Sequence, residues 1–205
     1  MNEFRKRGFT LIEILVVITI IGVLAGMVSL LIGPSRHMTM ILQCQKNLVG
    51  LTGLLEAAHP SRYPSHSGPD FVLYLVAKGS VVGQDQLEGL FCPGDMNESF
   101  EDAGGEQAYA DLDLAKSGSR GHLTSYAGRD QKTVEHRAKK GAGRTMVLLA
   151  DDSEDHHDGK GIVVGLTGGI AKWRDKVDRY KMSIDDPLEV GPNSTVEELK
   201  ALIAE

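Results

Sequence analysis

The sequence has no excess of positive charge. Its 205 residues include 22 Lys and Arg against 28 Asp and Glu, which gives a net charge of −6 at pH 7. Binding to nucleic acid requires a basic face, so this composition argues against a nucleic-acid partner. The charges are intermixed along the chain, which is typical of a solvated protein surface.

Sequence motifs of common enzyme classes are also missing. The chain has no G-x-S-x-G nucleophile motif, no phosphate-binding loop and no H-E-x-x-H motif. Gly141-Ala142-Gly143 precedes an apolar run that is typical of a strand and opens no helix, so it is not a dinucleotide-binding fingerprint. We therefore expect that the protein is not an enzyme.

An apolar run near the N-terminus is long enough to cross a membrane. The basic residues 5–7 and Gly8 precede it, and it ends near Ile32. By the positive-inside rule the N-terminus stays in the cytoplasm. We therefore expect a single-pass inner-membrane protein, in contact with membrane lipid, whose body is exported to the periplasm.

Two features distinguish this run from an ordinary signal peptide. The small residue stands before the apolar run, where a signal peptide would have it afterwards, and Glu13 lies inside the run. An ionised carboxylate in hydrocarbon costs several kcal/mol, so Glu13 is expected to have a functional partner. A position close enough to the lipid headgroups is the alternative.

The stretch Gly8-Phe9-Thr10-Leu11-Ile12-Glu13 resembles the processing signature of type IV pilins and type II secretion pseudopilins. The resemblance implies that a prepilin peptidase removes residues 1–8 by cutting between Gly8 and Phe9. It also implies that the new N-terminus of Phe9 is methylated. The leader carries a net charge of +2, so the processed chain would carry −8.

Processing would place an ammonium group at Phe9, four residues before Glu13. When helices pack side by side with an axial stagger, Glu13 of one subunit can meet the Phe9 ammonium of its neighbour. Each charge is costly alone in lipid and tolerable as a pair. We expect this pair to set the register among pilin or pseudopilin subunits that an inner-membrane platform assembles into a filament.

Helical periodicity continues from Phe9 to about Ala58. Residues 9–34 are apolar all round, as a membrane-spanning and filament-core helix should be, and Pro34 predicts a kink or break. The spacing Gly22-x-x-x-Gly26 would let a neighbouring helix approach closely. Residues 35–58 are amphipathic and should pack their apolar face on a head domain. The apolar positions of this part are Met38, Ile41, Leu42, Leu48, Leu51, Leu54 and Leu55.

Residues 59–192 have the composition of a globular head. After a loop, a short apolar run at 70–78 is expected to be a helix. The polar, Gly-rich segment 97–120 should form a long surface loop with a helical turn at 111–115.

The most regular part of the head is its second half. Strands are predicted at 145–150, 161–166 and 170–173, and the last two form a hairpin through Gly168-Gly169. An antiparallel sheet with one face on the stem helix completes an α+β, pilin-like fold. Residues 193–205 are expected to form a final helix, because Ser194 and Glu197 have the spacing of a capping box.

A second resemblance spans most of the chain. A group of pseudopilin-like bacterial proteins carries C-x-x-N-L on the stem, then C-P-x-D, S-Y, a strand ending in Asp, and a His followed by Asp-Gly. The matching pieces here are Cys44–Leu48, Cys92–Asp95, Ser125-Tyr126, Ala150-Asp151 and His157-Asp158-Gly159. One departure is the last hairpin, where that group often has Asp-Gly and this chain has Gly168-Gly169.

The chain has two cysteines, Cys44 on the stem and Cys92 in the head. In an exported protein an even number permits a disulfide. We predict a bridge that joins stem and head, and two free thiols are the alternative.

Acidic residues are dense between the second and third predicted strands. Oxygen-rich loops suit calcium, and the resemblance to type II secretion pseudopilins adds a precedent for structural calcium in a C-terminal loop. The candidate ligands are Asp151, Asp152, Glu154, Asp155 and Asp158. A solvated acidic loop is the alternative, and a transition metal on His156 and His157 is a third interpretation, although adjacent side chains of an extended chain point apart.

The sequence supports two hypotheses for function. The first is a structural subunit that a prepilin peptidase processes and that polymerises into a type II secretion pseudopilus or a type IV pilus-like filament. The second is a membrane-tethered exported binding module or metal-dependent enzyme that does not polymerise.

Overall fold

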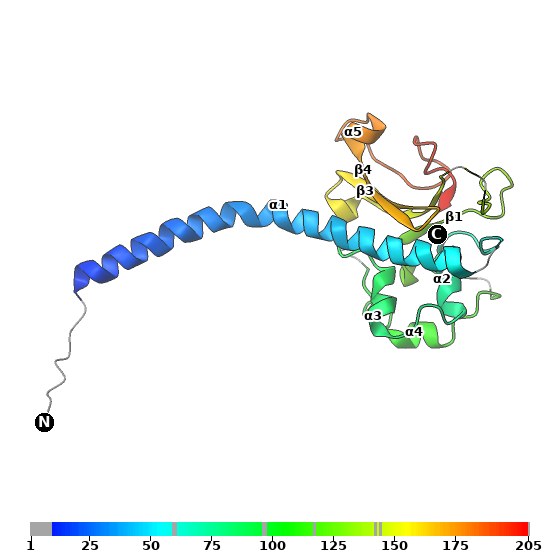
Figure 1. The fold of residues 1–205 in the computed structure, drawn as a ribbon, viewed down its shortest axis with the longest axis horizontal. Coiled ribbons are helices and arrows are strands. Elements are labelled where there is room, and N and C mark those ends of the chain that lie inside the picture. The colour runs from blue at the N-terminus through cyan, green and yellow to red at the C-terminus, as the bar shows by residue number, and fades with distance from the viewer. Residues whose placement is uncertain are drawn as a thin grey trace, which may run out of the picture. The chain divides into compact units, whose positions relative to one another are not determined.

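The computed structural model describes residues 10–58, 61–95, 98–116, 118–141, 143 and 145–204. The chain divides into two compact units, residues 1–39 and 40–205. Helix α1 (Leu11–Ala58) runs through both (Figure 1). The predicted cleavage and methylation site at Gly8 and Phe9 lies outside the described residues.

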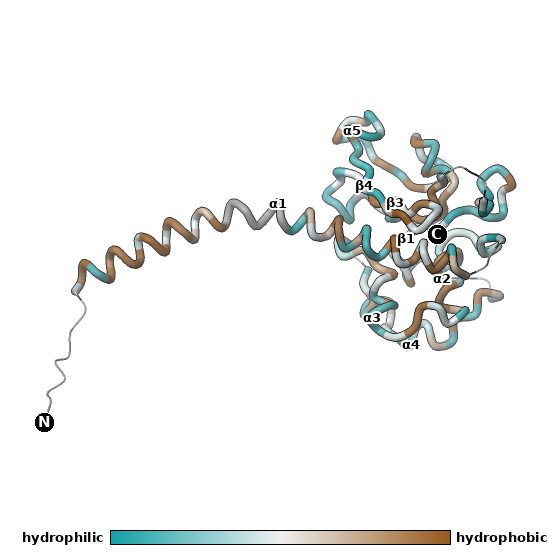
Figure 2. Tube along the Cα trace, viewed as in Figure 1, coloured by the Kyte–Doolittle hydropathy of each residue, from teal (hydrophilic) through white to brown (hydrophobic). Residues whose placement is uncertain are grey.

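The first unit contains the N-terminal part of α1. Its segment Leu11–Val28 has 18 residues with a mean hydropathy of 2.7, and none of it is buried within the structure. Figure 2 shows this segment as a predominantly apolar run. Its length and composition suit a single-pass membrane anchor.

Helix α1 continues without interruption through Pro34. The continuous helix contradicts a break at this proline, whereas the kink stays a prediction. A proline removes one internal hydrogen bond, whereas the turns on both sides still propagate the helix.

The second unit begins with the other half of α1, which supplies one side of the head's core. Five of its side chains are buried at a spacing of three or four residues: Ile41, Cys44, Leu48, Leu51 and Leu55. The predicted amphipathic face is thus confirmed for most of its positions. Met38 and Leu42 are exceptions, because each is 57% exposed.

The head contains a five-stranded antiparallel sheet in the order β4-β3-β2-β1-β5. Its strands are β1 (Tyr126–Arg129), β2 (Val147–Asp151), β3 (Gly161–Leu166), β4 (Ile170–Asp175) and β5 (Leu202–Ile203). The hairpin of β3 and β4 has the predicted turn, with Leu166 opposite Ile170. The α+β class and the antiparallel sheet are as the sequence predicted.

Both faces of the sheet are covered. The stem packs on one face, where a Cβ at Gly165 of β3 would lie 2.7 Å from the Thr52 side chain. On the opposite face Ile162, Val164 and Leu166 form a second core cluster. The C-terminal segment supplies the rest of that cluster with Leu188, Leu199 and Leu202.

Short helices cover the stem on its other side. Figure 1 shows α2 (Pro69–Ala77), α3 (Gln84–Leu87) and α4 (Glu106–Ala110) on the side of α1 opposite to β3 and β4. Helix α2 confirms the helix predicted at 70–78. The predicted helical turn at 111–115 is replaced by α4, immediately before it. The expected surface loop also contributes to the core, because Phe100 and Tyr109 are buried and their rings stack.

Four shorter elements complete the head. The single-turn 3₁₀ helices are η1 (Glu88–Leu90), η2 (Gly121–Leu123) and η3 (Glu154–His157), and α5 (Lys176–Tyr180) follows β4. Asp175 caps α5 by accepting hydrogen bonds from the backbone N–H groups of Val177 and Asp178.

The helix predicted at 193–205 is wrong. Turns lead instead to β5, which pairs with β1 through Leu202 opposite Arg129. The Ser194 hydroxyl accepts from the N–H of Val196 at 3.1 Å, whereas the Glu197 carboxylate pairs with Lys200 at 2.9 Å. The two halves of a capping box therefore do not meet. Burial of Leu199 and Leu202 against the sheet outweighs the local helix signal.

Candidate functional site

The start of α1 has a specific polar arrangement. The Glu13 carboxylate accepts hydrogen bonds from the backbone N–H and the hydroxyl of Thr10, at 2.8 and 2.9 Å. In return the Thr10 hydroxyl accepts from the N–H of Glu13 at 3.3 Å. This reciprocal pair is a capping box, which satisfies donors that the first turn of a helix leaves unpaired. Glu13 thus has a local structural role as well as the assembly role predicted for it.

The surface of the anchor is available for packing. Its large apolar side chains between Leu11 and Val28 are 49–84% exposed. A Cβ added at Gly22 or Gly26 would meet nothing within 4 Å. Because residues four apart share one helix face, the two glycines form a shallow strip against which another helix could lie. The predicted packing role of Gly22 and Gly26 therefore remains a prediction.

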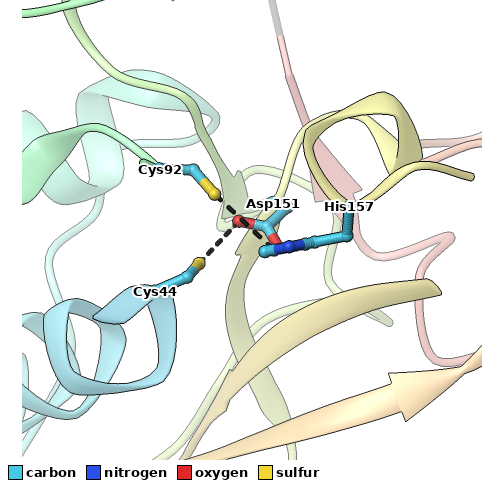
Figure 3. A group of neighbouring side chains, drawn as sticks. All are labelled: Cys44, Cys92, Asp151 and His157. Carbon is cyan, nitrogen blue, oxygen red and sulfur yellow. Dashed lines mark hydrogen bonds and ion pairs between the residues drawn. The ribbon is translucent and has the colours of Figure 1, made fainter. Parts of the chain in front are cut away.

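A second group of functional side chains lies in the interior of the head. Cys44, Cys92, Asp151 and His157 each offer a ligand atom, and these atoms lie within 4.8 Å of one another (Figure 3). All four residues are buried, with exposed fractions between 0 and 2%. We refer to them as the CCDH cluster.

Four separate segments supply the CCDH cluster. Cys44 comes from α1, and Cys92 follows η1 at a turn. Asp151 is the last residue of β2, and His157 is the last residue of η3. The cluster thus joins the stem to three parts of the head.

Direct contacts link the four side chains. The Cys44 thiol donates to Asp151 Oδ1 at 2.9 Å, and His157 Nε2 lies 3.0 Å from Asp151 Oδ2. The same His157 nitrogen lies 3.6 Å from Cys92 Sγ. The N–H of Val163 donates to Asp151 Oδ2 at 2.8 Å and fixes the carboxylate. The His157 and Trp173 rings are nearly perpendicular, with an interplanar angle of 85° and ring centroids 5.3 Å apart.

Burial and mutual contact shift the acidity of these groups. Burial raises the pKa of the Cys44 thiol, and its contacts with Cys92 and Asp151 raise it further. The hydrogen bond with Cys44 lowers the pKa of Cys92, and contacts with His156 and His157 lower it as well. Burial alone would lower the pKa of His157, but hydrogen bonds to Asp151 and Cys92 raise it to about 9. At Cys92 these contacts outweigh burial, which alone would raise the pKa of this thiol.

Two opposing influences act on the pKa of the Asp151 carboxyl group. Burial raises the pKa of Asp151, and the hydrogen bond with His157 counteracts this rise.

Neighbouring polar groups position the cluster. The Asn47 amide donates to the carbonyl of Phe91 at 3.1 Å, and the Tyr126 hydroxyl lies 3.6 Å from Cys44 Sγ. The Ser125 hydroxyl accepts from the N–H of Cys92 at 3.1 Å. Each of the five short motifs that resemble those of the pseudopilin-like proteins therefore contributes a residue to the CCDH cluster or to its immediate surroundings.

The structure does not contain the predicted disulfide. It brings Cys44 and Cys92 together, as the prediction required, but both are free thiols. Each sulfur has another partner, Asp151 for Cys44 and His157 for Cys92.

The predicted calcium ligands do not converge. Asp151 points into the interior, whereas Asp152 pairs with His156 at 3.5 Å. Asp155 is exposed, and Asp158 pairs with Lys160 at the surface. Glu154 lies on η3, and its side chain is outside the described part of the structure. A calcium site needs six to eight converging oxygen atoms, so the described residues of this loop do not form one.

The two adjacent histidines have different partners, as expected for neighbouring side chains. His156 Nε2 lies 3.3 Å from Asp95 Oδ2, while His157 faces Asp151. A transition metal held by both histidines therefore stays a prediction. Only His157 belongs to the CCDH cluster.

Comparison with known proteins identifies the N-terminal segment. Residues 4–29 match the family model described as the prokaryotic N-terminal methylation motif. This match and the apolar helix within it are consistent with the type IV pilin and pseudopilin family. Comparison with curated proteins and with solved structures gave no match.

Proposed function

We propose that this chain, which carries the prokaryotic N-terminal methylation motif, is a pilin-like structural subunit. A prepilin peptidase cuts it after Gly8 and methylates Phe9. The subunit then leaves the inner membrane and polymerises into a type II secretion pseudopilus or a type IV pilus-like filament. In this role the protein catalyses no reaction and serves as a structural unit of the filament.

The observation that carries this proposal is the combination of the motif with the anchor. The motif covers residues 4–29, and the helix Leu11–Val28 inside it has no buried residue. An apolar helix surface of this extent requires lipid or other apolar helices around it. A filament core supplies such helices, and the membrane supplies lipid before assembly.

The two halves of α1 suit two different surroundings. The first half is apolar on all sides, whereas the second half buries one face in the head through residues such as Leu48 and Leu55. A subunit with this division can leave its head at the filament surface while its anchor enters the core. The heads then form a shell around packed helices.

The ion pair between Glu13 and the Phe9 ammonium of a neighbouring subunit sets the axial register of the assembly. Glu13 stays exposed at the start of the helix, where it could pair with the Phe9 ammonium of a neighbour. An isolated charge in lipid or in a packed apolar core is costly. The pairing therefore favours one axial stagger over others.

Co-expression tests the proposal. The full chain would be produced with a prepilin peptidase and an inner-membrane assembly platform, and filaments would be sheared from the cells and examined by electron microscopy and immunoblotting. We expect filaments that contain the processed chain, and none when the peptidase is omitted. A processed chain that stays in the membrane fraction under all conditions, and whose head binds a ligand or turns over a substrate, would support the tethered module instead.

A further inference from the structure

We propose that Cys44, Cys92, Asp151 and His157 form a structural zinc site that fastens the stem helix to the head. The proposal is independent of filament assembly, because it concerns only the second unit of the chain. It takes the place of the disulfide predicted between the two cysteines, and of the candidate calcium ligands it uses Asp151 alone.

The donor set indicates the metal. Two thiols, an imidazole and a carboxylate are ligands that Zn²⁺ accepts in a tetrahedral site, whereas Ca²⁺ requires oxygen atoms throughout. Soft thiolate ligands also exclude Mg²⁺. Among the common divalent ions of the cell, Zn²⁺ fits these four side chains best.

The distances agree with this choice. Tetrahedral bonds of the usual lengths to zinc place the ligand atoms about 3.3–3.8 Å from one another. Here Cys92 Sγ and His157 Nε2 are 3.6 Å apart, and all four ligand atoms lie within 4.8 Å. The Cys44 Sγ–Asp151 Oδ1 distance of 2.9 Å would have to open by about half an ångström, and His157 Nε2, 3.0 Å from Asp151 Oδ2, would turn from that oxygen to the metal.

Charge supports an ion at this position. Asp151 is completely buried, and the two thiols beside it become anions when they bind metal. A buried anion is costly unless it is paired or coordinates a cation. A divalent ion would neutralise two of the three negative charges at once.

The surroundings provide the outer contacts that metal sites use. Asp151 Oδ2 accepts from the N–H of Val163, which leaves Oδ1, the oxygen facing Cys44, to bind metal. The N–H of Cys92 is fixed by the Ser125 hydroxyl, and the His157 ring lies against Trp173. Such contacts orient ligands and are part of functional metal sites.

The number of ligands and their burial indicate a structural site. Four protein ligands close a tetrahedral site, whereas a catalytic zinc keeps one position open for water. Because the ligands come from α1, the turn after η1, β2 and η3, one ion would hold four segments together. It would also occupy the thiols and so protect them from oxidation in the periplasm.

A cobalt titration tests the site on the full-length protein in detergent. The protein would be reduced, stripped with a chelator and titrated with Co²⁺ under anaerobic conditions. We expect one Co²⁺ per chain, a thiolate-to-cobalt charge-transfer band in the near ultraviolet, and displacement of the band by Zn²⁺. Absence of this band from the reduced wild-type protein would overturn the proposal, whatever the variants do.

Matched variants locate the ligands. Asp151→Asn and Cys92→Ser should weaken Co²⁺ binding by at least about a hundredfold, whereas Asp155→Asn, an exposed carboxylate of the same loop, should leave it unchanged. Binding that survives Asp151→Asn and is lost in Asp155→Asn would place the metal in the acidic loop and contradict the site.

Three measurements on the wild-type protein complete the test, and they do not require that any variant folds. Protein isolated from the membrane should contain one zinc ion by elemental analysis and two thiols that alkylate only after chelation. Chelation should also lower Tm by about 10 °C. Isolation with a Cys44–Cys92 disulfide and no metal would overturn the proposal.

Discussion

Glu13→Gln is expected to reduce incorporation of the subunit into filaments by about a hundredfold. Removing one member of a buried ion pair costs about 3 kcal/mol or more, because the remaining charge stays unpaired. Glutamine keeps an oxygen that can accept the hydrogen bonds from Thr10. The variant therefore removes the charge and preserves the first turn of the helix. The measurement is the ratio of filament to membrane-bound subunit in sheared cells.

Thr10→Ala provides the matched control. It removes the hydroxyl that caps the helix, at a cost of about 1 kcal/mol, but it keeps the Glu13 carboxylate. We expect filament incorporation close to that of the wild-type chain. Normal incorporation of Glu13→Gln together with a defect in Thr10→Ala would show that Glu13 acts through helix capping and would contradict the register role.

Gly94→Ala is expected to destabilise the head strongly. A Cβ at residue 94 would lie 1.7 Å from the carbonyl oxygen of His156. The carbonyl belongs to the backbone, and the backbone also fixes the position of a Cβ, so neither group can rotate away. The turn after Cys92 would have to move from η3, and the free energy of unfolding should fall by about 3–5 kcal/mol.

Gly89→Ala tests whether this effect is specific. A Cβ at residue 89 would meet nothing closer than the Asn47 side chain at 4.0 Å. Its unfolding midpoint should match that of the wild-type head in chemical denaturation of the full chain in detergent. Equal midpoints for Gly94→Ala and Gly89→Ala would mean that the turn after Cys92 does not pack on η3 as described.

Elements with a strong local pattern were predictable from the sequence. The helix α1 follows from apolar periodicity over 48 residues. Strands β2 and β3 follow from short apolar runs, and β4 follows from the Gly168-Gly169 turn that joins it to β3. In contrast, β1 contains Gly128 and Arg129, and β5 has two residues. Both of these strands exist because of pairing with distant segments, which local propensity does not reveal.

The C-terminal segment shows how a tertiary contact can override a local signal. Ser194 and Glu197 have the spacing of a helix start, but Leu199 and Leu202 fill the second core cluster on the sheet. The free energy of burying such side chains, about 1.5–3 kcal/mol each, exceeds the few tenths that helix propensity contributes per residue.

The CCDH cluster was only partly predictable. Density of acidic residues pointed to a surface calcium loop, because the sequence does not state which of them face inward. Alternation along β2 carries that information, since Leu149 and Asp151 share one face and Ala150 lies on the other. The pairing of Cys44 with Asp151 across 107 residues depends on the tertiary fold alone.

Mass spectrometry of the N-terminus of the protein in its native membrane tests the central claim most directly. A filament subunit of this type should begin at Phe9 and carry one methyl group on its amine, with residues 1–8 removed. A protein that retains Met1 through Gly8 would never generate the ammonium that Glu13 needs, and this result would contradict assembly through that pair.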